Sequence, residues 1–161
     1  MVADTYIFRS EDVALYLVAC ANEKKIVVNI TKVQKLLYII YGTYLRVFGK
    51  RLLDEHPQAW PYGPVFPLTR TVIKRKIKTE YLSFPMDSVN QELRQDANLN
   101  KTIDFVLSHF GKWNAGQLTE WSHRDGSPWA LTVNKDGFSW GWVIPDEYIL
   151  DFFTKLVRVP E

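Results

Sequence analysis

Cysteine and histidine are scarce in this sequence, which contains one cysteine and three histidines. A single thiol, that of Cys20, cannot form an intramolecular disulfide, and a zinc site built on cysteines is not expected. We therefore interpret Cys20 as a small buried apolar side chain rather than a nucleophile.

Long apolar runs are also absent. No stretch approaches the roughly 18 apolar residues that a bilayer-spanning helix needs, and Met1–Ser10 lacks the basic start and apolar centre of a signal peptide. We expect a cytoplasmic protein with no membrane partner.

Sequence motifs for nucleotide or metal chemistry are missing as well. The chain has no Walker A loop, no Gly-x-Gly-x-x-Gly, no zincin helix and no EF-hand loop. The segment Asp54-Glu55-His56 has no second histidine at ligand spacing, so a polar turn is expected there. We predict no metal and no cofactor.

One cluster contains the side-chain types of a hydrolase triad: Ser122, His123 and Asp125. Triads are assembled across a fold, however, and the strained Gly-x-Ser-x-Gly elbow of many hydrolases is absent. His123 follows an expected helix C-terminus, where the helix dipole favours a protonated imidazole. We therefore predict a structural or partner-binding histidine and no enzyme activity.

The composition is that of a folded globular protein, with 47% hydrophobic, 24% charged and an unusually high 14% aromatic residues. We expect a mainly α fold, a single compact helical domain of six or seven helices over residues 1–161, with a minor β element. The strongest helix lies between Thr31 and Phe48, where apolar side chains recur at steps of three and four residues. Thr31 and Gln34 predict a capping box at its start, and Gly49 predicts its end.

Other expected helix starts combine a capping side chain or a proline with an apolar periodic run. They lie at Ser10, Pro67, Asn98 or Asn100, Asn114 with Gln117, Ser127 with Pro128, and Pro145. A helix over 87–97 has the weakest signal. Alternation of Phe138, Trp140 and Trp142 with small residues predicts a small strand or arm with an aromatic face.

Positive charge is concentrated in the first half of the chain. Residues 1–78 hold 13 basic and 6 acidic side chains, whereas residues 79–161 hold 7 and 12. Four bases, Arg70, Lys74, Arg75 and Lys78, follow the expected helix start at Pro67, and Leu68, Val72, Ile73 and Ile77 are expected to face inward. The basic face is either a solvated helix surface or an electrostatic footprint for phosphates or an acidic partner.

The segment Ala59–Pro67 holds three prolines, one glycine and three aromatic residues, a composition that excludes a helix. Residues that precede proline are pushed towards extended conformations, so a stiff ribbon carrying large rings is expected. Gly63 is free to adopt a positive φ.

Three segments occur in an order that is found in one known protein family. They are Ile30–Tyr38, with Gln34, Lys35 and Tyr38; Ala59–Pro67, with Trp60, Tyr62, Gly63 and Pro64; and Leu118–Trp129, with His123 and Trp129. On these motifs the chain resembles the SocA-like, phage-associated family known as the Panacea antitoxin domain. Ser122 stands where threonine is more typical, and the segments 82–99 and 138–142 lie outside the resemblance.

The resemblance implies an antitoxin that neutralises a toxin encoded beside it by direct protein–protein binding, without catalysis. One branch of the family is an adaptor that delivers its toxin to a protease, which is the alternative function. The motif residues named above are then structural or partner-binding. A loop shared by relatives that bind different toxins is best explained as scaffold, with Trp60 and Tyr62 packed against the central helix near His123 and Trp129.

A further alternative comes from the residues themselves. The basic side chains Arg70, Lys74, Arg75 and Lys78 would suit a nucleic-acid-binding autoregulator, whose affinity should fall steeply with salt.

Overall fold

Eight α-helices and two small sheets make up the computed structural model over residues 5–160, the part of the chain that it describes. The helices are α1 (Ser10–Glu23), α2 (Ile30–Phe48), α3 (Pro67–Lys76), α4 (Gln91–Gln95), α5 (Ala97–Phe110), α6 (Ala115–His123), α7 (Pro128–Val133) and α8 (Asp146–Leu156), with a 3₁₀ turn at Met86–Ser88. The strands are β1 (Tyr6–Phe8), β2 (Arg51–Leu53), β3 (Gln58–Trp60) and β4 (Gly63–Val65). The start of the Met1–Ser10 segment and both ends of the expected 1–161 domain lie outside the described residues.

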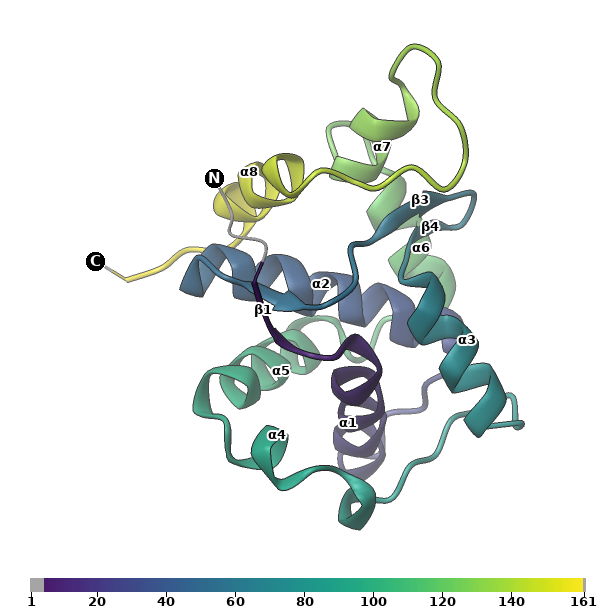
Figure 1. Cartoon of the computed structure of the whole chain (residues 1–161), viewed down its shortest axis with the longest axis vertical. Helices are drawn as coiled ribbons and strands as arrows, with labels where there is room; N and C mark the ends of the chain where they lie inside the picture. The colour runs from purple at the N-terminus through teal and green to yellow at the C-terminus, as the bar shows by residue number, and fades with distance from the viewer. Residues whose placement is uncertain (1–4, 161) are drawn as a thin grey trace.

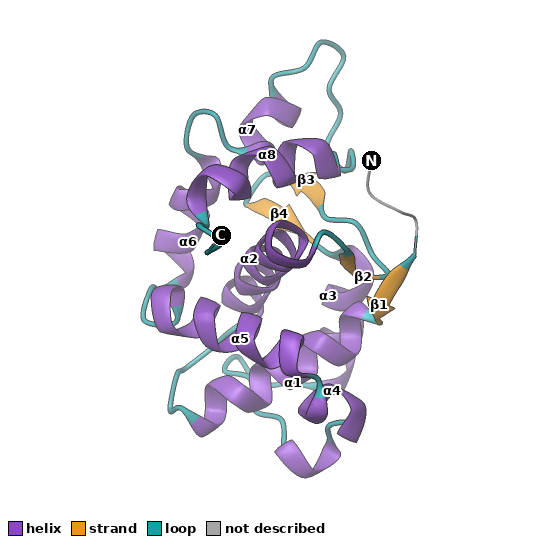
Figure 2. Cartoon of the chain, turned by 90° about the vertical axis from the view of Figure 1, so that its left-hand side faces the viewer, coloured by secondary structure: helices purple, strands orange, loops and turns teal. Residues whose placement is uncertain are grey.

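Helix α2 is the centre of the fold. Helices α1, α3, α5, α6 and α8 contact it, as do strands β2 and β4, and Figure 2 looks nearly along its axis with the other helices arranged around it. In Figure 1, α5 and α8 lie on opposite sides of α2, while the β3–β4 hairpin, α3 and α6 gather near its N-terminal end. The mainly α prediction is confirmed.

The C-terminal helix packs closely on α2 because one position of α2 has no side chain. A Cβ added to Gly42 would lie 2.2 Å from the Phe153 ring of α8. The Tyr41 hydroxyl donates to the Asp146 carboxylate at 2.5 Å, which ties the first turn of α8 to the same part of α2. Buried Tyr38 meets Phe153 edge to face, with ring centroids 5.7 Å apart.

The predicted end of α2 is confirmed, but its predicted start is wrong. Gly49 ends the helix in the left-handed conformation, at a φ of 67°. The N-cap is Asn29, whose side chain accepts from the Lys32 backbone at 2.8 Å, so Thr31 and Gln34 form no capping box. Gln34 instead accepts a hydrogen bond from outside the helix.

Two other predicted caps are also wrong. Ser10 is the first residue of α1 rather than its cap, because its side chain and N–H bond to residues that follow β2. Helix α5 is capped by Asp96, which accepts from Leu99 N at 2.8 Å, rather than by Asn98 or Asn100. Because Asp96 also closes α4, the 87–97 segment supplies an additional short helix, and the helix count is eight rather than six or seven.

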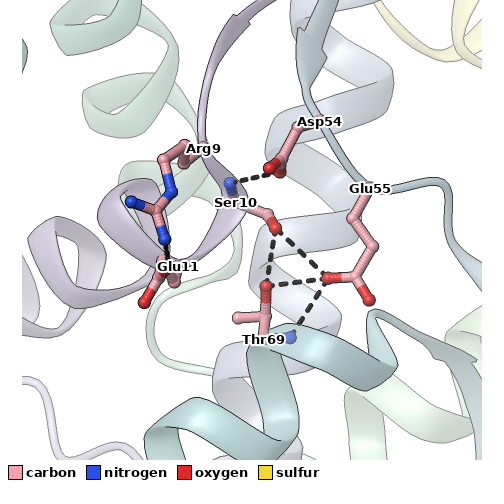
Figure 3. A network of polar contacts seen from close by, with 6 residues as sticks. All are labelled: Arg9, Ser10, Glu11, Asp54, Glu55 and Thr69. Carbon is pink, nitrogen blue, oxygen red and sulfur yellow. Dashed lines mark hydrogen bonds and ion pairs between the residues drawn. The ribbon is translucent and has the colours of Figure 1, made fainter.

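Consecutive acidic residues, Asp54 and Glu55, connect the starts of α1 and α3 (Figure 3). Asp54 accepts from the Ser10 backbone at 2.8 Å. The buried Glu55 carboxylate accepts from Leu68 N at 2.5 Å and Thr69 N at 3.1 Å, and also contacts the Thr69 and Ser10 hydroxyls. Carboxylates satisfy free N–H groups at helix N-termini and interact favourably with the helix dipole, so this turn fixes α1 against α3.

The two sheets are short, and the predicted aromatic strand does not form. Strand β1 pairs in parallel with β2, and β3 pairs antiparallel with β4. The segment from Phe138 to Trp142 is a loop with a turn at Trp140 and Gly141. It bonds to Ala59 of β3, whose N–H donates to the Trp142 carbonyl at 2.8 Å and whose carbonyl accepts from Gly141 N at 2.9 Å, and an isolated bridge joins Gln58 to Val143 just after it. Gly137 and Gly141 have positive φ, which interrupts an extended strand.

The inward face of α3 differs from the prediction. Ile73 is buried, but the Leu68 side chain is exposed and Thr69 is buried in its place. Thr69 faces inward because its N–H and hydroxyl both bond to Glu55.

Among residues 5–160, no helix has the length and apolar character needed to cross a membrane.

Candidate functional site

The β3–β4 hairpin is built from the extended Ala59–Pro67 segment, with Pro61 and Tyr62 at its turn. Gly63 follows at a φ of 112°, a conformation that side chains rarely adopt. A Cβ at Gly63 would lie 2.6 Å from the Ser122 Oγ and 2.8 Å from the Lys35 Cε. Position 63 therefore requires glycine for two reasons: its backbone conformation and its close contacts with Ser122 and Lys35.

Two consecutive residues of α2 hold the end of this hairpin. The Gln34 Oε1 accepts from Phe66 N at 2.7 Å, and the Lys35 ammonium donates to the Pro64 carbonyl at 3.2 Å. Both side chains are 2% exposed. Burial lowers the pKa of Lys35 to about 8, so its ammonium is still mostly charged at pH 7.

His123 and Trp129 form a stack beside the hairpin. Their ring centroids are 3.8 Å apart with the planes 9° from parallel, and the Trp129 indole donates to the Trp60 carbonyl at 2.8 Å. Burial, and after it the nearby Lys35 charge, lowers the pKa of His123. Both effects oppose the helix dipole, which favours the protonated imidazole.

The turn between α6 and α7 is held by Ser127. Its hydroxyl donates to the Ser122 carbonyl at 2.8 Å and accepts from Ala130 N at 3.1 Å. This confirms the predicted cap, and Pro128 takes the first helical position beside it. Asn114 and Gln117 also form the predicted capping box of α6.

A groove of about 420 Å³ opens between the start of α2, the hairpin and α3. We call it the Lys35 groove; the residues that line it include Thr31, Gln34, Lys35, Trp60, Tyr62 and Arg70. The Arg70 guanidinium lies 5.8 Å from the centroid of the Trp60 ring. A neighbouring groove of about 480 Å³ shares Thr31 and extends along Lys74 and Lys78.

The structure brings most of the predicted site residues together, and a few lie apart. Gln34, Lys35, Trp60, Gly63, Pro64, His123 and Trp129 meet around the hairpin through the contacts above. Packing of Tyr62 on α2, which the scaffold interpretation predicts, is wrong, because Tyr62 sits at the hairpin turn and is 75% exposed. Tyr38 lies in the core, where burial raises its pKa.

The four predicted bases do not form one uniform face. Arg70 is partly covered and lies over Trp60, whereas Lys74, Arg75 and Lys78 are exposed. Helix α3 ends at Lys76, so Lys78 lies beyond the helix rather than on its stripe.

The sequence pattern missed the roles of Glu55 and Thr69. Glu55 lies twelve residues before Pro67, the first residue of α3, and gives no local capping signal, since cap motifs compare only residues within one turn.

Trp140 and Trp142 are exposed on the segment that precedes α8. Their rings contact Phe138, and the Trp140 ring also reaches Trp129 at 6.3 Å between centroids. The aromatic side chains of the predicted arm therefore cluster without forming a strand. Among residues 5–160, no group of three or more histidine, cysteine or acidic side chains is placed to hold a metal ion.

Comparison with known proteins identifies the family. The family described as "Antitoxin SocA-like, Panacea domain" matches residues 33–130, which include every motif residue from Gln34 to Trp129. The chain is 34% identical over 131 residues to a curated protein named Antitoxin SocA from Caulobacter vibrioides (strain NA1000 / CB15N), with 74% of this chain and 69% of the relative covered. No solved structure gives a significant match. On the family match and this relative, the chain belongs to the antitoxin SocA-like, Panacea domain family.

Proposed function

We propose that this protein is an antitoxin that neutralises a toxin encoded beside it, in the cytoplasm, by binding the toxin directly. Family membership supports an antitoxin role in general. The observation that carries the binding proposal is the Lys35 groove, where a rigid hairpin presents the exposed Tyr62 ring above two buried polar side chains. Tyrosine, tryptophan and arginine are the side chains that most often anchor protein interfaces.

Rigidity of the hairpin favours binding without a large ordering cost. Gln34 and Lys35 bond to its β4 side, and Trp129 bonds to its β3 side. A surface that is already ordered loses less conformational entropy when a partner binds. The proposed interface is therefore preformed.

Co-expression with the product of the adjacent reading frame tests the proposal. We expect growth to be restored and the two proteins to co-elute on a sizing column. Absence of both rescue and complex would contradict direct neutralisation.

The proposed antitoxin role requires no catalytic step from His123. Its imidazole is stacked on Trp129, and burial lowers its pKa. We expect His123→Ala to neutralise the toxin as well as wild type does per folded molecule, measured by growth rescue normalised to the amount of folded protein. Complete loss of rescue by a stable, toxin-binding His123→Ala protein would indicate chemistry.

The antitoxin could also act as an adaptor that binds the toxin and delivers it to a protease; this is the alternative to direct neutralisation. In that case the toxin should be short-lived in cells that contain the protease and persist when the host's ATP-dependent proteases are deleted one at a time. Equal toxin half-lives in every strain would exclude the adaptor role.

Autoregulation through nucleic acid is a second candidate, favoured by the exposure of Lys74, Arg75 and Lys78. Binding to the protein's own promoter DNA should weaken steeply as salt increases, because each phosphate contact releases counterions. A promoter fragment that is not shifted at low salt would remove this candidate.

A further inference from the structure

The Lys35 groove contains buried polar groups that the protein itself does not fully satisfy. Gln34 uses its oxygen on Phe66 N, but its amide nitrogen has no hydrogen-bond partner in the described structure. Lys35 has one acceptor, the Pro64 carbonyl, for an ammonium with three N–H groups. Buried polar groups are normally paired, so these donors leave room for an acceptor that comes from outside the chain.

The charge of the groove is uncompensated. Within residues 5–160, the ion pairs involve neither Lys35 nor Arg70. Both charged side chains that line the groove are basic, and no acidic residue lines it. A buried ammonium is costly to leave unpaired, and an anion within about 4 Å favours its charged form.

The position of the groove adds to this preference for an anion. Thr31 lies in the first turn of the 19-residue helix α2 and lines the groove. The N-terminus of a helix carries a partial positive charge. The neighbouring groove, which shares Thr31, is lined by two bases, Lys74 and Lys78, and by one acid, Glu80.

The walls of the groove suit a protein side chain. The Trp60 and Tyr62 rings border it, and its volume falls within the roughly 300–1,000 Å³ that is usual for small-ligand pockets. Aromatic rings beside basic side chains suit a carboxylate with apolar groups next to it. An aspartate or glutamate on a protein surface has this chemistry.

Resting on the proposed function, we propose that the Lys35 groove is the toxin-docking site and receives an aspartate or glutamate side chain of the toxin. The carboxylate accepts from Lys35, Gln34 and Arg70, while apolar groups beside it pack on Trp60 and Tyr62. The acidic side chain thus completes the hydrogen bonding of the groove.

The experiment measures the affinity of the toxin, produced from the adjacent reading frame, for a set of antitoxin variants. Lys35→Met keeps the side-chain length and removes the charge, and we expect it to weaken binding at least tenfold. Arg70→Gln and Tyr62→Ser change accessible side chains and keep the test valid if Lys35→Met folds poorly. We expect toxin affinity to fall about tenfold for Arg70→Gln and at least threefold for Tyr62→Ser. The control Arg94→Gln removes an exposed charge on α4 and should stay within twofold of wild type.

A second set of variants identifies the occupant. Each aspartate and glutamate of the toxin is changed in turn to asparagine or glutamine. One of these toxin variants should bind the wild-type antitoxin at least tenfold more weakly than the unchanged toxin does. The same toxin change should weaken binding to the Lys35→Met antitoxin little further, because both substitutions remove the same interaction.

The outcomes separate the two proposals. If wild type neither binds nor neutralises the toxin, the proposed function and the docking site both fall. If wild type neutralises the toxin but the three groove variants bind within twofold of wild type, or no toxin acid couples to Lys35, the docking site alone is overturned. Binding of promoter DNA that is lost in Lys35→Met would overturn it in favour of a phosphate site.

Discussion

The buried carboxylate of Glu55 offers the sharpest test of how this fold is held together. Its Oε2 accepts from Leu68 N. Its Oε1 accepts from Thr69 N and also contacts the Thr69 and Ser10 hydroxyls (Figure 3). Glu55→Gln keeps the shape but replaces one oxygen with an NH₂ group. In either orientation of the amide, that NH₂ faces a backbone N–H of α3 and leaves it without an acceptor.

The expected loss of unfolding free energy follows from these contacts. A hydrogen bond to a charged group contributes about 1.5–3 kcal/mol, and a charge at a partly buried helix terminus adds up to about 2 kcal/mol. Because the two overlap, we expect Glu55→Gln to lower the unfolding free energy by about 3 kcal/mol. In a chain of this size, that corresponds to a fall in Tm of roughly 6–12 °C.

Urea denaturation followed by tryptophan fluorescence measures the change, with Asp54→Asn as the matched control. Asp54 is exposed, and asparagine retains an oxygen that can accept from Ser10 N. Asparagine and aspartate are equally good caps, so the control should stay within about 0.5 kcal/mol of wild type. If Glu55→Gln is no less stable than the control, the interpretation of Glu55 as the cap of α3 is refuted.

Three further predictions concern α2 and the hairpin. Gly42→Ala should lower stability by about 1–3 kcal/mol, since its Cβ would overlap the Phe153 ring; an unchanged urea midpoint would show that α8 moves freely. Because burial lowers the folded-state pKa of Lys35 to about 8 from 10.5, folding is favoured as pH rises above 8, and wild type should gain about 1 kcal/mol over Lys35→Met between pH 7 and 9; parallel stability curves would contradict this. Trp60→Ala should remain folded but bind toxin weakly, because Trp129 bonds to the backbone of Trp60 rather than to its ring; loss of the folded near-ultraviolet circular dichroism signal would instead make Trp60 scaffold.

The parts of the fold that local sequence determines could be predicted. The apolar period of α2, the glycine end at Gly49, the capping box of Asn114 with Gln117 and the Ser127 cap all depend on residues within about one turn. The extended hairpin segment was equally predictable, because proline restricts itself and the residue before it.

Two of the wrong cap predictions have the same physical origin, which is competition from partners that are distant in sequence. Thr31 and Gln34 fit a capping box, but Asn29 caps the helix and the Gln34 oxygen bonds to Phe66 N, 32 residues away. Ser10 looks like a cap, yet its side chain bonds to Glu55, 45 residues away. A local motif states what a residue can bond to, whereas the fold decides which partner reaches it.

Scaffolding explains much of the hairpin region but not Lys35. Gly63 has to be glycine for steric reasons, and Trp129 and Gln34 fix the hairpin through its backbone. The one hydrogen bond from Lys35 to a carbonyl stabilises the fold by less than the burial of its charge costs. Replacing a buried charge with an apolar side chain is often neutral or stabilising. Proteins retain such destabilising groups where binding or catalysis needs them. Because an acidic residue from a partner would turn this isolated charge into an ion pair, the presence of Lys35 is better explained by binding than by folding.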